Sequence, residues 1–438
     1  MNHVKQIFLI EDEYVPKDSI KHLMDESAYE FLLEHQYLKG SPNGYIAFQY
    51  VGVITYSSNL ICVLPKYLKG SSLSEFEKKA KFKTVLKVLK KVQNSILLPD
   101  SKYSKNSGEY ISEIAVADFL LRDYIDNGLY QKRREEVLLN SNGEVNWDRT
   151  ISTLDPIISK GQPIYHDLYN YTNITEEYNV IGELHKWAVK HCLDKYSDIL
   201  EYNTSFQEDC VQEWNSLGDL EYLLGVLERE LRITYIDREI NLFENIYKLL
   251  SKKGKNINTN FNIYGTGYFH TVWEQVCSNS FNNKKDYYSK HIPKPVWKNN
   301  VGETVLKETI IPDVVATNRD LTSFFVLDAK YYNFRMHQTP QFYVTDNPGV
   351  GDVSKQILYE KAFKDVAIEK KYNVFLFPGI IDSFYKIEGS VTFALLEGHR
   401  VFNLILNPEI LFENYLSNDN IGFDHLDRIG CEIDCKEE

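Results

Sequence analysis

The stretch Thr309–Tyr332, TIIPDVVATNRDLTSFFVLDAKYY, predicts a β-hairpin. Its two flanks, Ile310–Ala316 and Ser323–Tyr332, are rich in the β-branched and aromatic residues that favour strands. The polar segment Thr317–Thr322 between them is typical of a turn. The apolar character of both flanks predicts that the hairpin lies inside a sheet, so the charged residues on it call for an explanation.

Two carboxylates and one ammonium group are predicted to meet on this hairpin. Asp313 follows a proline on the first strand, while Asp328 and Lys330 lie two residues apart on the second and project from the same face. Burying such charges without partners is costly, which favours a site that uses them over a core that tolerates them. The alternative is an edge hairpin with solvated acidic and basic side chains.

The charged residues also carry a resemblance. Pro312, Asp313, Asp328, Ala329 and Lys330 resemble the PD-(D/E)xK motif of the restriction-endonuclease-like nuclease superfamily, with Ala329 in the free position. The resemblance implies that the two acidic residues bind a divalent metal ion. It also implies that the lysine helps to position and activate the attacking water.

The residue types suit hydrolysis of a phosphodiester. Such an anion resists attack by another anion, so a cation is needed to neutralise the transition state and lower the pKa of the attacking water. Mg²⁺ prefers carboxylate and carbonyl oxygens, which fits Asp313, Asp328 and the backbone carbonyl of Ala329; Mn²⁺ would serve similarly. Lys330 would act as a point charge beside the nucleophile.

A helix before the hairpin supplies a further carboxylate. The stretch Tyr268–Phe281 has a helical pattern, and the resemblance places Glu274 where several superfamily members carry an additional metal-binding acid. His270 lies one turn earlier on the same face, and we interpret it as a packing or hydrogen-bonding residue.

A helix is also predicted after the hairpin, over Asp352–Lys371. Gln356 and Tyr359 resemble a Gln and a Tyr that some superfamily branches place there, although the spacing is one residue shorter than QxxxY. We expect Gln356 to orient the lysine or a phosphate, with a surface amide as the alternative.

The chain is acidic overall but contains basic stretches. Its 49 basic and 62 acidic residues give a net charge of −13, whereas affinity for DNA comes mainly from lysine and arginine. An acidic nuclease must therefore concentrate positive charge locally or rely on a partner. A stretch before the hairpin, interleaved with Tyr287, Tyr288 and Trp297, is a hypothetical DNA contact, with a solvated loop as the alternative; its lysines are Lys284, Lys285, Lys290, Lys294 and Lys298.

The first 165 residues read as α+β. A hairpin is predicted over Tyr45–Thr55 and Leu60–Pro65, followed by a lysine-rich amphipathic helix over Glu75–Leu97. The lysine face would contact nucleic acid or an acidic partner, or simply be solvated. A further helix is predicted over Glu109–Gly128.

Three segments resemble the McrC subunit of McrBC-type restriction systems: Ile61–Lys66, Asn127–Tyr130 and Gly143–Thr150. Together with the C-terminal half, they make the chain similar to the LlaJI-type restriction endonucleases. In McrC-like proteins this portion implies docking to a ring-forming, McrB-like AAA+ NTPase. The chain has no GxxxxGK[ST] motif, so another subunit would have to bind the nucleotide.

We therefore expect a mixed α/β protein with three segments: an N-terminal McrC-like α+β domain (1–165) that docks the partner, a helical connector (166–255) and a PD-(D/E)xK nuclease domain (256–438). We expect the acidic end, Cys431–Glu438, to be frayed. The six cysteines have no zinc-like spacing, and no apolar run is long enough to cross a bilayer, so we expect a cytoplasmic protein.

The resulting hypothesis is a Mg²⁺-dependent type II or type IV restriction endonuclease subunit that cuts double-stranded DNA in phage defence. A homodimer or higher assembly would provide one active site for each strand. The alternatives are a noncatalytic DNA-binding or adaptor subunit with a nuclease-like fold and a stand-alone repair nuclease. Retention of both aspartates and the lysine counts against the adaptor.

Overall fold

The chain forms two compact units. The computed structural model describes residues 5–21, 23–56, 59–95, 113–176, 178–202, 204, 206, 211–254, 261–338 and 340–437. The larger unit consists of Met1–Tyr110 and Asn258–Glu438, and the middle unit of Ile111–Ile257. This division differs from the three expected segments, because the two ends of the chain share one unit and residues 111–165 join the helices that follow them.

The N-terminal part of the larger unit contains a four-stranded sheet and a separate three-stranded sheet, ordered β2-β4-β3. The four strands are ordered β1-β6-β5-β11, with β1 parallel to β6 and the other pairs antiparallel. The last strand comes from the C-terminal part of the chain, which is why the two ends share a unit. The bounds are β1 (Lys5–Ile10), β2 (Val15–Pro16), α1 (Glu26–Glu34), β3 (Leu38–Gly40), β4 (Tyr45–Phe48), β5 (Val51–Tyr56), β6 (Asn59–Leu64), α2 (Glu75–Ser95) and β11 (Phe261–Thr266).

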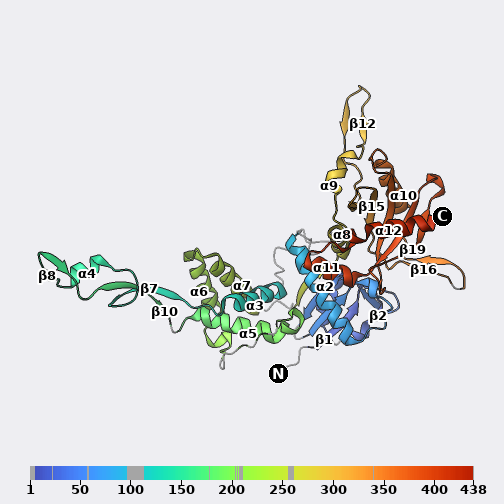
Figure 1. Ribbon diagram of the computed structural model, residues 1–438. Coiled ribbons are helices and arrows are strands. Elements are labelled where there is room, and N and C mark those ends of the chain that lie inside the picture. Colours follow the sequence, from blue (N-terminus) through green and yellow to red (C-terminus); the bar gives the residue numbers. More distant parts are fainter. Residues whose placement is uncertain are drawn as a thin grey trace. The chain divides into compact units, whose positions relative to one another are not determined.

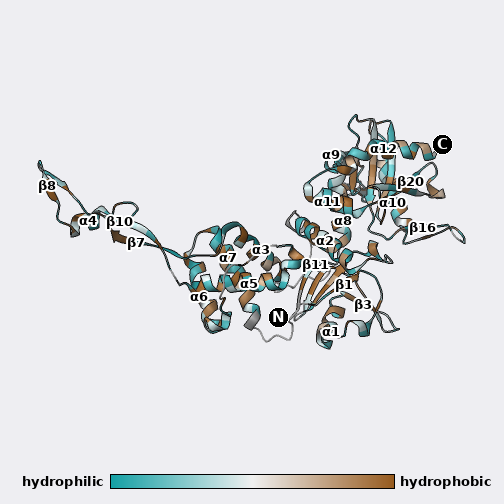
Figure 2. Cartoon of the chain, turned by 60° about the horizontal axis from the view of Figure 1, so that its bottom comes forward, coloured by the Kyte–Doolittle hydropathy of each residue, from teal (hydrophilic) through white to brown (hydrophobic). Residues whose placement is uncertain are grey.

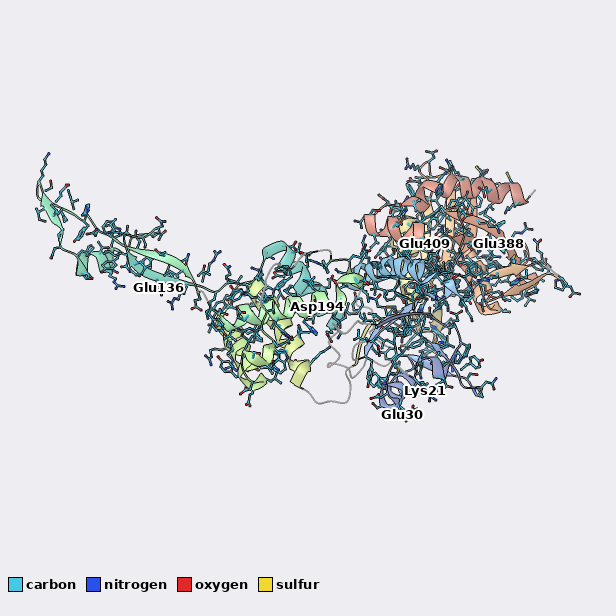
Figure 3. The ribbon with its side chains drawn as sticks, turned by 90° about the horizontal axis from the view of Figure 1, so that it is seen from below. Lys21, Glu30, Glu136, Asp194, Glu388 and Glu409 are labelled. Carbon is cyan, nitrogen blue, oxygen red and sulfur yellow. The ribbon has the colours of Figure 1, made fainter. Side chains whose placement is uncertain are left out.

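The hairpin expected over Tyr45–Thr55 and Leu60–Pro65 is confirmed for β5 and β6, which pair antiparallel, whereas Tyr45–Phe48 is a separate strand, β4, of the three-stranded sheet. The turn residues 57–58 lie outside the described residues. Apolar residues dominate these strands, as the brown colour near β1 and β11 shows in Figure 2. The expected basic helix is α2, described to Ser95. Part of its lysine face packs on α11 (Pro408–Ser417): Lys81 pairs with Glu409, labelled in Figure 3, and the Lys91 ammonium donates to Asn418 Oδ1 at 2.7 Å.

A second sheet of five strands forms the C-terminal part of the larger unit (Figure 1). Its order is β14-β15-β18-β20-β19; β15, β18 and β20 run parallel, and the two edge strands are antiparallel to their neighbours. Every residue of β15 is buried, as expected for a parallel strand covered on both faces. The bounds are β14 (Val314–Thr317), β15 (Ser323–Ala329), β18 (Lys370–Pro378), β19 (Tyr385–Thr392) and β20 (Arg400–Leu406).

Helices cover this sheet, and two small ribbons extend from it. On one face, Phe324 and Val326 pack with Tyr359 of α10 (Val350–Ala362) and with Phe363, which follows that helix. On the other face, Phe325 stacks on Tyr372, whose hydroxyl donates to Asp434 of α12 (Ile421–Glu437). The remaining elements are α8 (Phe269–Ser280), α9 (Lys285–Tyr288), β12 (Val296–Lys298), β13 (Thr304–Leu306), β16 (Arg335–His337), β17 (Tyr343–Thr345), α10 (Val350–Ala362) and α12 (Ile421–Glu437). Strands β12 and β13 form one ribbon, and β16 and β17 the other.

The middle unit contains helices and an arm. Arg238 of α7 forms a bidentate ion pair with Asp123 of α3, at 2.8 and 3.0 Å. The arm is a two-stranded ribbon of β7 and β10 whose outer part holds α4, β8 and β9 (Figure 1). The bounds are α3 (Glu113–Asn127), β7 (Arg133–Leu139), α4 (Trp147–Thr153), β8 (Ile157–Ser159), β9 (Gln162–Ile164), β10 (Tyr169–Thr175), α5 (Val180–Leu200), α6 (Leu220–Ile233) and α7 (Asp237–Gly254).

Several boundaries depart from the sequence prediction, while the mixed α/β class is confirmed. The helix expected over Asp352–Lys371 ends at Ala362, because Lys370 already begins β18. The prediction of a frayed C-terminal end is wrong, because α12 continues to Glu437. The Tyr372 hydroxyl and the Lys370 ammonium donate to the Asp434 carboxylate at 3.0 and 2.5 Å. Within the described ranges, no helix is long and apolar enough to cross a membrane.

Candidate active site

The hairpin expected from the sequence is present and brings the two aspartates together. Strands β14 and β15 pair antiparallel, with Val314 opposite Leu327. Asp313 lies just before β14, and its Oδ2 atom accepts a hydrogen bond from the backbone N–H of Ala329 at 2.9 Å. Asn283 fixes the strand end by donating to the Asp313 carbonyl at 2.8 Å. The Asp313 carboxylate is therefore tied to the residue between Asp328 and Lys330.

Lys330 forms two close ion pairs. Its Nζ atom lies 2.7 Å from Asp328 Oδ2 and 3.0 Å from Asp352 Oδ1, in the first turn of α10. Burial acts to lower the pKa of Lys330, but the two carboxylates outweigh it and raise that pKa above its ordinary value. The two ion pairs therefore favour the charged form of Lys330.

The carboxylates of the site repel one another. Burial, and then repulsion by Asp328 and Glu274, raises the pKa of Asp313 to about 7. Burial and Asp328 likewise raise the pKa of Glu274, on α8. Buried carboxylates that repel each other are stabilised by a bound cation, so the electrostatics of this group suit one.

The oxygen donors fit a partly hydrated hard cation better than a preformed cage. Across the described parts of the chain, no three His, Cys, Asp or Glu side chains are arranged as a ready metal site. The donors at hand are the carboxylates of Asp313 and Asp328 and the carbonyl of Ala329, with Glu274 as an electrostatic neighbour. Mg²⁺ is commonly held by one or two carboxylates while it keeps several waters.

Gln356 is hydrogen-bonded to the sheet that carries the site. Its side chain is fully buried, and its Nε2 atom donates to the carbonyls of Val326 at 3.1 Å and Val374 at 3.4 Å. The amide thus joins α10 to two strands, so the surface alternative is wrong. Tyr359 is also buried, and its hydroxyl donates to the Ile311 carbonyl at 2.8 Å, which holds the segment before Asp313.

The predicted DNA-contacting lysines have different surroundings. Lys284 is half-buried, and its ammonium donates to Thr317 at 2.8 Å, a structural contact. Lys285 is half-buried in α9, and Lys290 and Lys294 are exposed. The following ribbon, β12 and β13, exposes every side chain, including Trp297. Six lysines stand against three acidic residues between 284 and 308.

A cavity of about 360 Å³ adjoins Lys330, and part of its wall comes from the N-terminal sheet. Its lining residues are Glu11, Asp12, Gln49, Lys66, Gly267, Phe269, His270, Glu274, Ala329, Lys330, Tyr331 and Tyr332. Glu11 accepts a hydrogen bond from the Tyr331 hydroxyl at 2.6 Å, and burial raises the pKa of Glu11 to about 7.

Sequence reasoning missed Asp352, Glu11 and Tyr331, and gave Lys66 no role. A sequence signal existed for Asp352, because it is an acidic residue in the first turn of the helix after the lysine. That helix covers the face of the sheet onto which Lys330 should project, given the alternation of side chains along β15. No such signal existed for Glu11, because over 300 residues separate it from its partner Tyr331.

The chain matches known restriction proteins. The model of the LlaJI restriction endonuclease family matches residues 50–409. The type II restriction enzyme BsuMI component YdjA of Bacillus subtilis (strain 168) is 32% identical over 437 residues, covering 97% of this chain and 92% of that protein.

Two solved assemblies are more distant. A refined half-complex of Thermococcus gammatolerans McrB AAA+ hexamers with bound McrC gives 14% identity and a TM-score of 0.37, covering 94% of this chain and all of that one. The McrBC complex of the same organism gives 13% identity and a TM-score of 0.25, covering 56% and 80%. The family model and the Bacillus relative both span most of the sequence, and the chain belongs to the LlaJI restriction endonuclease family.

Proposed function

We propose that this chain is the DNA-cutting subunit of a restriction system and that it hydrolyses phosphodiester bonds in double-stranded DNA with Mg²⁺ or Mn²⁺. The observation that carries the proposal is the convergence of Asp313, Asp328 and Lys330 at the ends of β14 and β15. Family membership supports the nuclease reaction, and the lysine-rich segment 284–308 supports DNA as its substrate.

Each group would have a distinct task. Asp313, Asp328 and the Ala329 carbonyl would hold the cation, which when bound supplies Lewis acidity and charge neutralisation. Lys330, held in its charged form by Asp352, would stabilise negative charge that develops on the phosphate. Glu274 would add negative charge that favours the cation. Gln356 would hold α10 against β15, the strand that carries Asp328.

We further propose that a McrB-like AAA+ NTPase activates cleavage. The chain lacks a nucleotide-binding P-loop of its own, and its net charge of −13 opposes unaided DNA binding. The arm exposes several large apolar side chains, which a protein partner would cover: Trp147, Ile151, Ile157, Ile158 and Ile164. Two copies would cut the two strands.

The test is cleavage by variants of this chain, assayed with and without a McrB-like AAA+ protein. Asp313→Asn, Asp328→Asn and Lys330→Gln should each reduce Mg²⁺-dependent cleavage by about 100-fold or more, because each removes charge from the reacting centre. Asp320→Asn, in the exposed turn of the same hairpin, is the matched control and should cut like the parent. Parent-like cutting by all three site variants would refute the assignment.

A further inference from the structure

The cavity beside Lys330 lies where the ends of two sheets meet. Glu11 and Asp12 follow β1, Lys66 follows the parallel strand β6, and Tyr331 comes just after β15. The carboxyl ends of parallel strands are common ligand-binding positions in α/β proteins. Here such ends from both sheets line one cavity. The N-terminal sheet is thus part of the wall of the candidate active site.

Hydrogen bonds fix this junction. The backbone N–H of Lys66 donates to the Tyr331 hydroxyl at 3.0 Å and to Glu11 Oε2 at 3.3 Å, and the same hydroxyl donates to Glu11 at 2.6 Å. Tyr331 is the residue after Lys330. The position of Lys66 is therefore tied, through one side chain, to the strand end that carries the reacting lysine.

The Lys66 ammonium is weakly engaged, in contrast to that of Lys330. Among the described residues, its nearest anion is Asp12 Oδ2 at 3.8 Å, too long for a hydrogen bond, and it lies 4.7 Å from the centre of the Tyr331 ring. Asp12 is itself hydrogen-bonded by Gln49. The Lys66 side chain is 24% exposed, so an anion entering the cavity can reach it.

The cavity lining carries the acidic residues Glu11, Asp12 and Glu274, so among its described residues an anion such as a phosphate would be met only by the lysines. Among the described residues lining the cavity, the lysine and arginine side chains are those of Lys66 and Lys330. Asp328 and Asp352 already occupy Lys330 at hydrogen-bonding distance. A DNA strand in the cavity would present one phosphate to the reacting centre and neighbouring phosphates to its walls. Lys66 is the side chain positioned to meet one of these.

We propose that Lys66 binds a phosphate of the DNA strand that is cut, so that the N-terminal sheet forms one side of the active site. This proposal rests on the nuclease function proposed above. It explains why the McrC-like segment Ile61–Lys66 leads into the same cavity as Lys330. It also gives Glu11 and Tyr331 a task, namely to hold Lys66 in place.

The test compares Lys66→Gln, Lys66→Met and Lys66→Arg in the full chain, under conditions where the parent cuts DNA. The initial cleavage rate is measured against DNA concentration at several salt concentrations. Loss of a charge-assisted phosphate contact should raise the half-saturating DNA concentration about tenfold in the Gln and Met variants, with little change in the saturating rate. The slope of log affinity against log salt concentration should become shallower by about one in the Gln and Met variants, as expected for the loss of one phosphate contact. The Arg variant should restore most of the affinity.

Controls separate this inference from the nuclease proposal. Lys39→Gln removes the same charge from an exposed strand residue, in β3, and should behave as the parent. If Lys66→Gln and Lys66→Met match Lys39→Gln while Asp328→Asn abolishes cutting, the Lys66 assignment alone is wrong. If the parent cuts no DNA with or without the AAA+ protein, the nuclease proposal fails.

Discussion

At the scale of single residues, Lys330 is held by two carboxylates that differ in their burial and in the element that carries them. Asp328 shares its strand and is almost fully buried, whereas Asp352 reaches the lysine from α10 and is 29% exposed. A cation bound by Asp328 would compete with Lys330 for that carboxylate. Asp352 would then be the remaining anchor of the lysine, so we interpret it as a positioning residue.

Asp352→Asn should slow cleavage at saturating DNA by about 100-fold, because a misplaced catalytic group costs about this much. The half-saturating DNA concentration should stay near the parent value, since Asp352 carries no positive charge for DNA. Single-turnover cleavage measured against DNA concentration separates the two quantities.

The conservative variant provides the control for this effect. Asp352→Glu keeps the charge and should recover part of the rate. Thermal unfolding of both variants checks that the helix remains folded, since the side chain is partly exposed. A parent-like saturating rate for Asp352→Asn would show that Asp328 alone positions Lys330.

At the scale of elements, the sequence predicted what depends on local pattern. The β-branched and aromatic runs and the polar turn segment of residues 309–332 predicted the hairpin, and a helical pattern predicted α8. Strand β14 begins only at Val314, because the preceding segment is held by the Tyr359 hydroxyl rather than by a neighbouring strand. The surface alternative for Gln356 was wrong because burial of a helix face against a sheet depends on tertiary packing, which the sequence pattern does not show.

The site was predictable only where its residues are close in sequence or carried by a motif. Asp313, Asp328 and Lys330 come from one hairpin and do converge. The pairing of β11 with β5, which brings the N-terminal sheet to the cavity, joins strands about 200 residues apart. No local pattern encodes such a pairing, so Glu11 and Lys66 could not be assigned to the site in advance.

Glu11 makes the junction between the sheets sensitive to pH. Burial raises its pKa to about 7 in the folded protein, well above the ordinary value near 4.5. The folded state therefore holds the proton more tightly, and the stabilisation present below about pH 4.5 is lost as pH rises toward and through 7. The shift corresponds to about 3 kcal/mol.

Glu11→Gln should remove this pH dependence, because the amide does not ionise and still accepts the Tyr331 hydrogen bond. The quantity to compare is the free energy of unfolding of the variant minus that of the parent. This difference should be about 3 kcal/mol larger at pH 8 than at pH 4.5. Urea unfolding of both proteins at the two pH values measures this difference. A difference that does not change with pH would mean that Glu11 is ionised at little cost.

At the scale of the whole molecule, the candidate site and the arm belong to different units. Asp313, Asp328 and Lys330 lie in the larger unit, and the exposed apolar side chains of Ile157 and Ile158 lie on the arm of the middle unit. Figure 3 labels Glu136 on the same arm, in β7. A chain organised in this way can separate partner binding from chemistry, and a variant can then affect one without the other.

The double variant Ile157→Asp/Ile158→Asp should reduce cleavage in the presence of the AAA+ protein and nucleotide to the level seen without that protein. The reason is that two charges would have to be buried in an apolar contact. Its thermal stability should match the parent, since both side chains are more than half exposed, at 61% and 66%.

Ser159→Asp, an exposed residue on the same strand, adds a charge without removing an apolar side chain and should retain stimulation. Cleavage assays with and without the AAA+ protein, together with co-purification, measure both effects. Full stimulation of the double variant would place the partner contact elsewhere and leave the exposed isoleucines of the arm to another role.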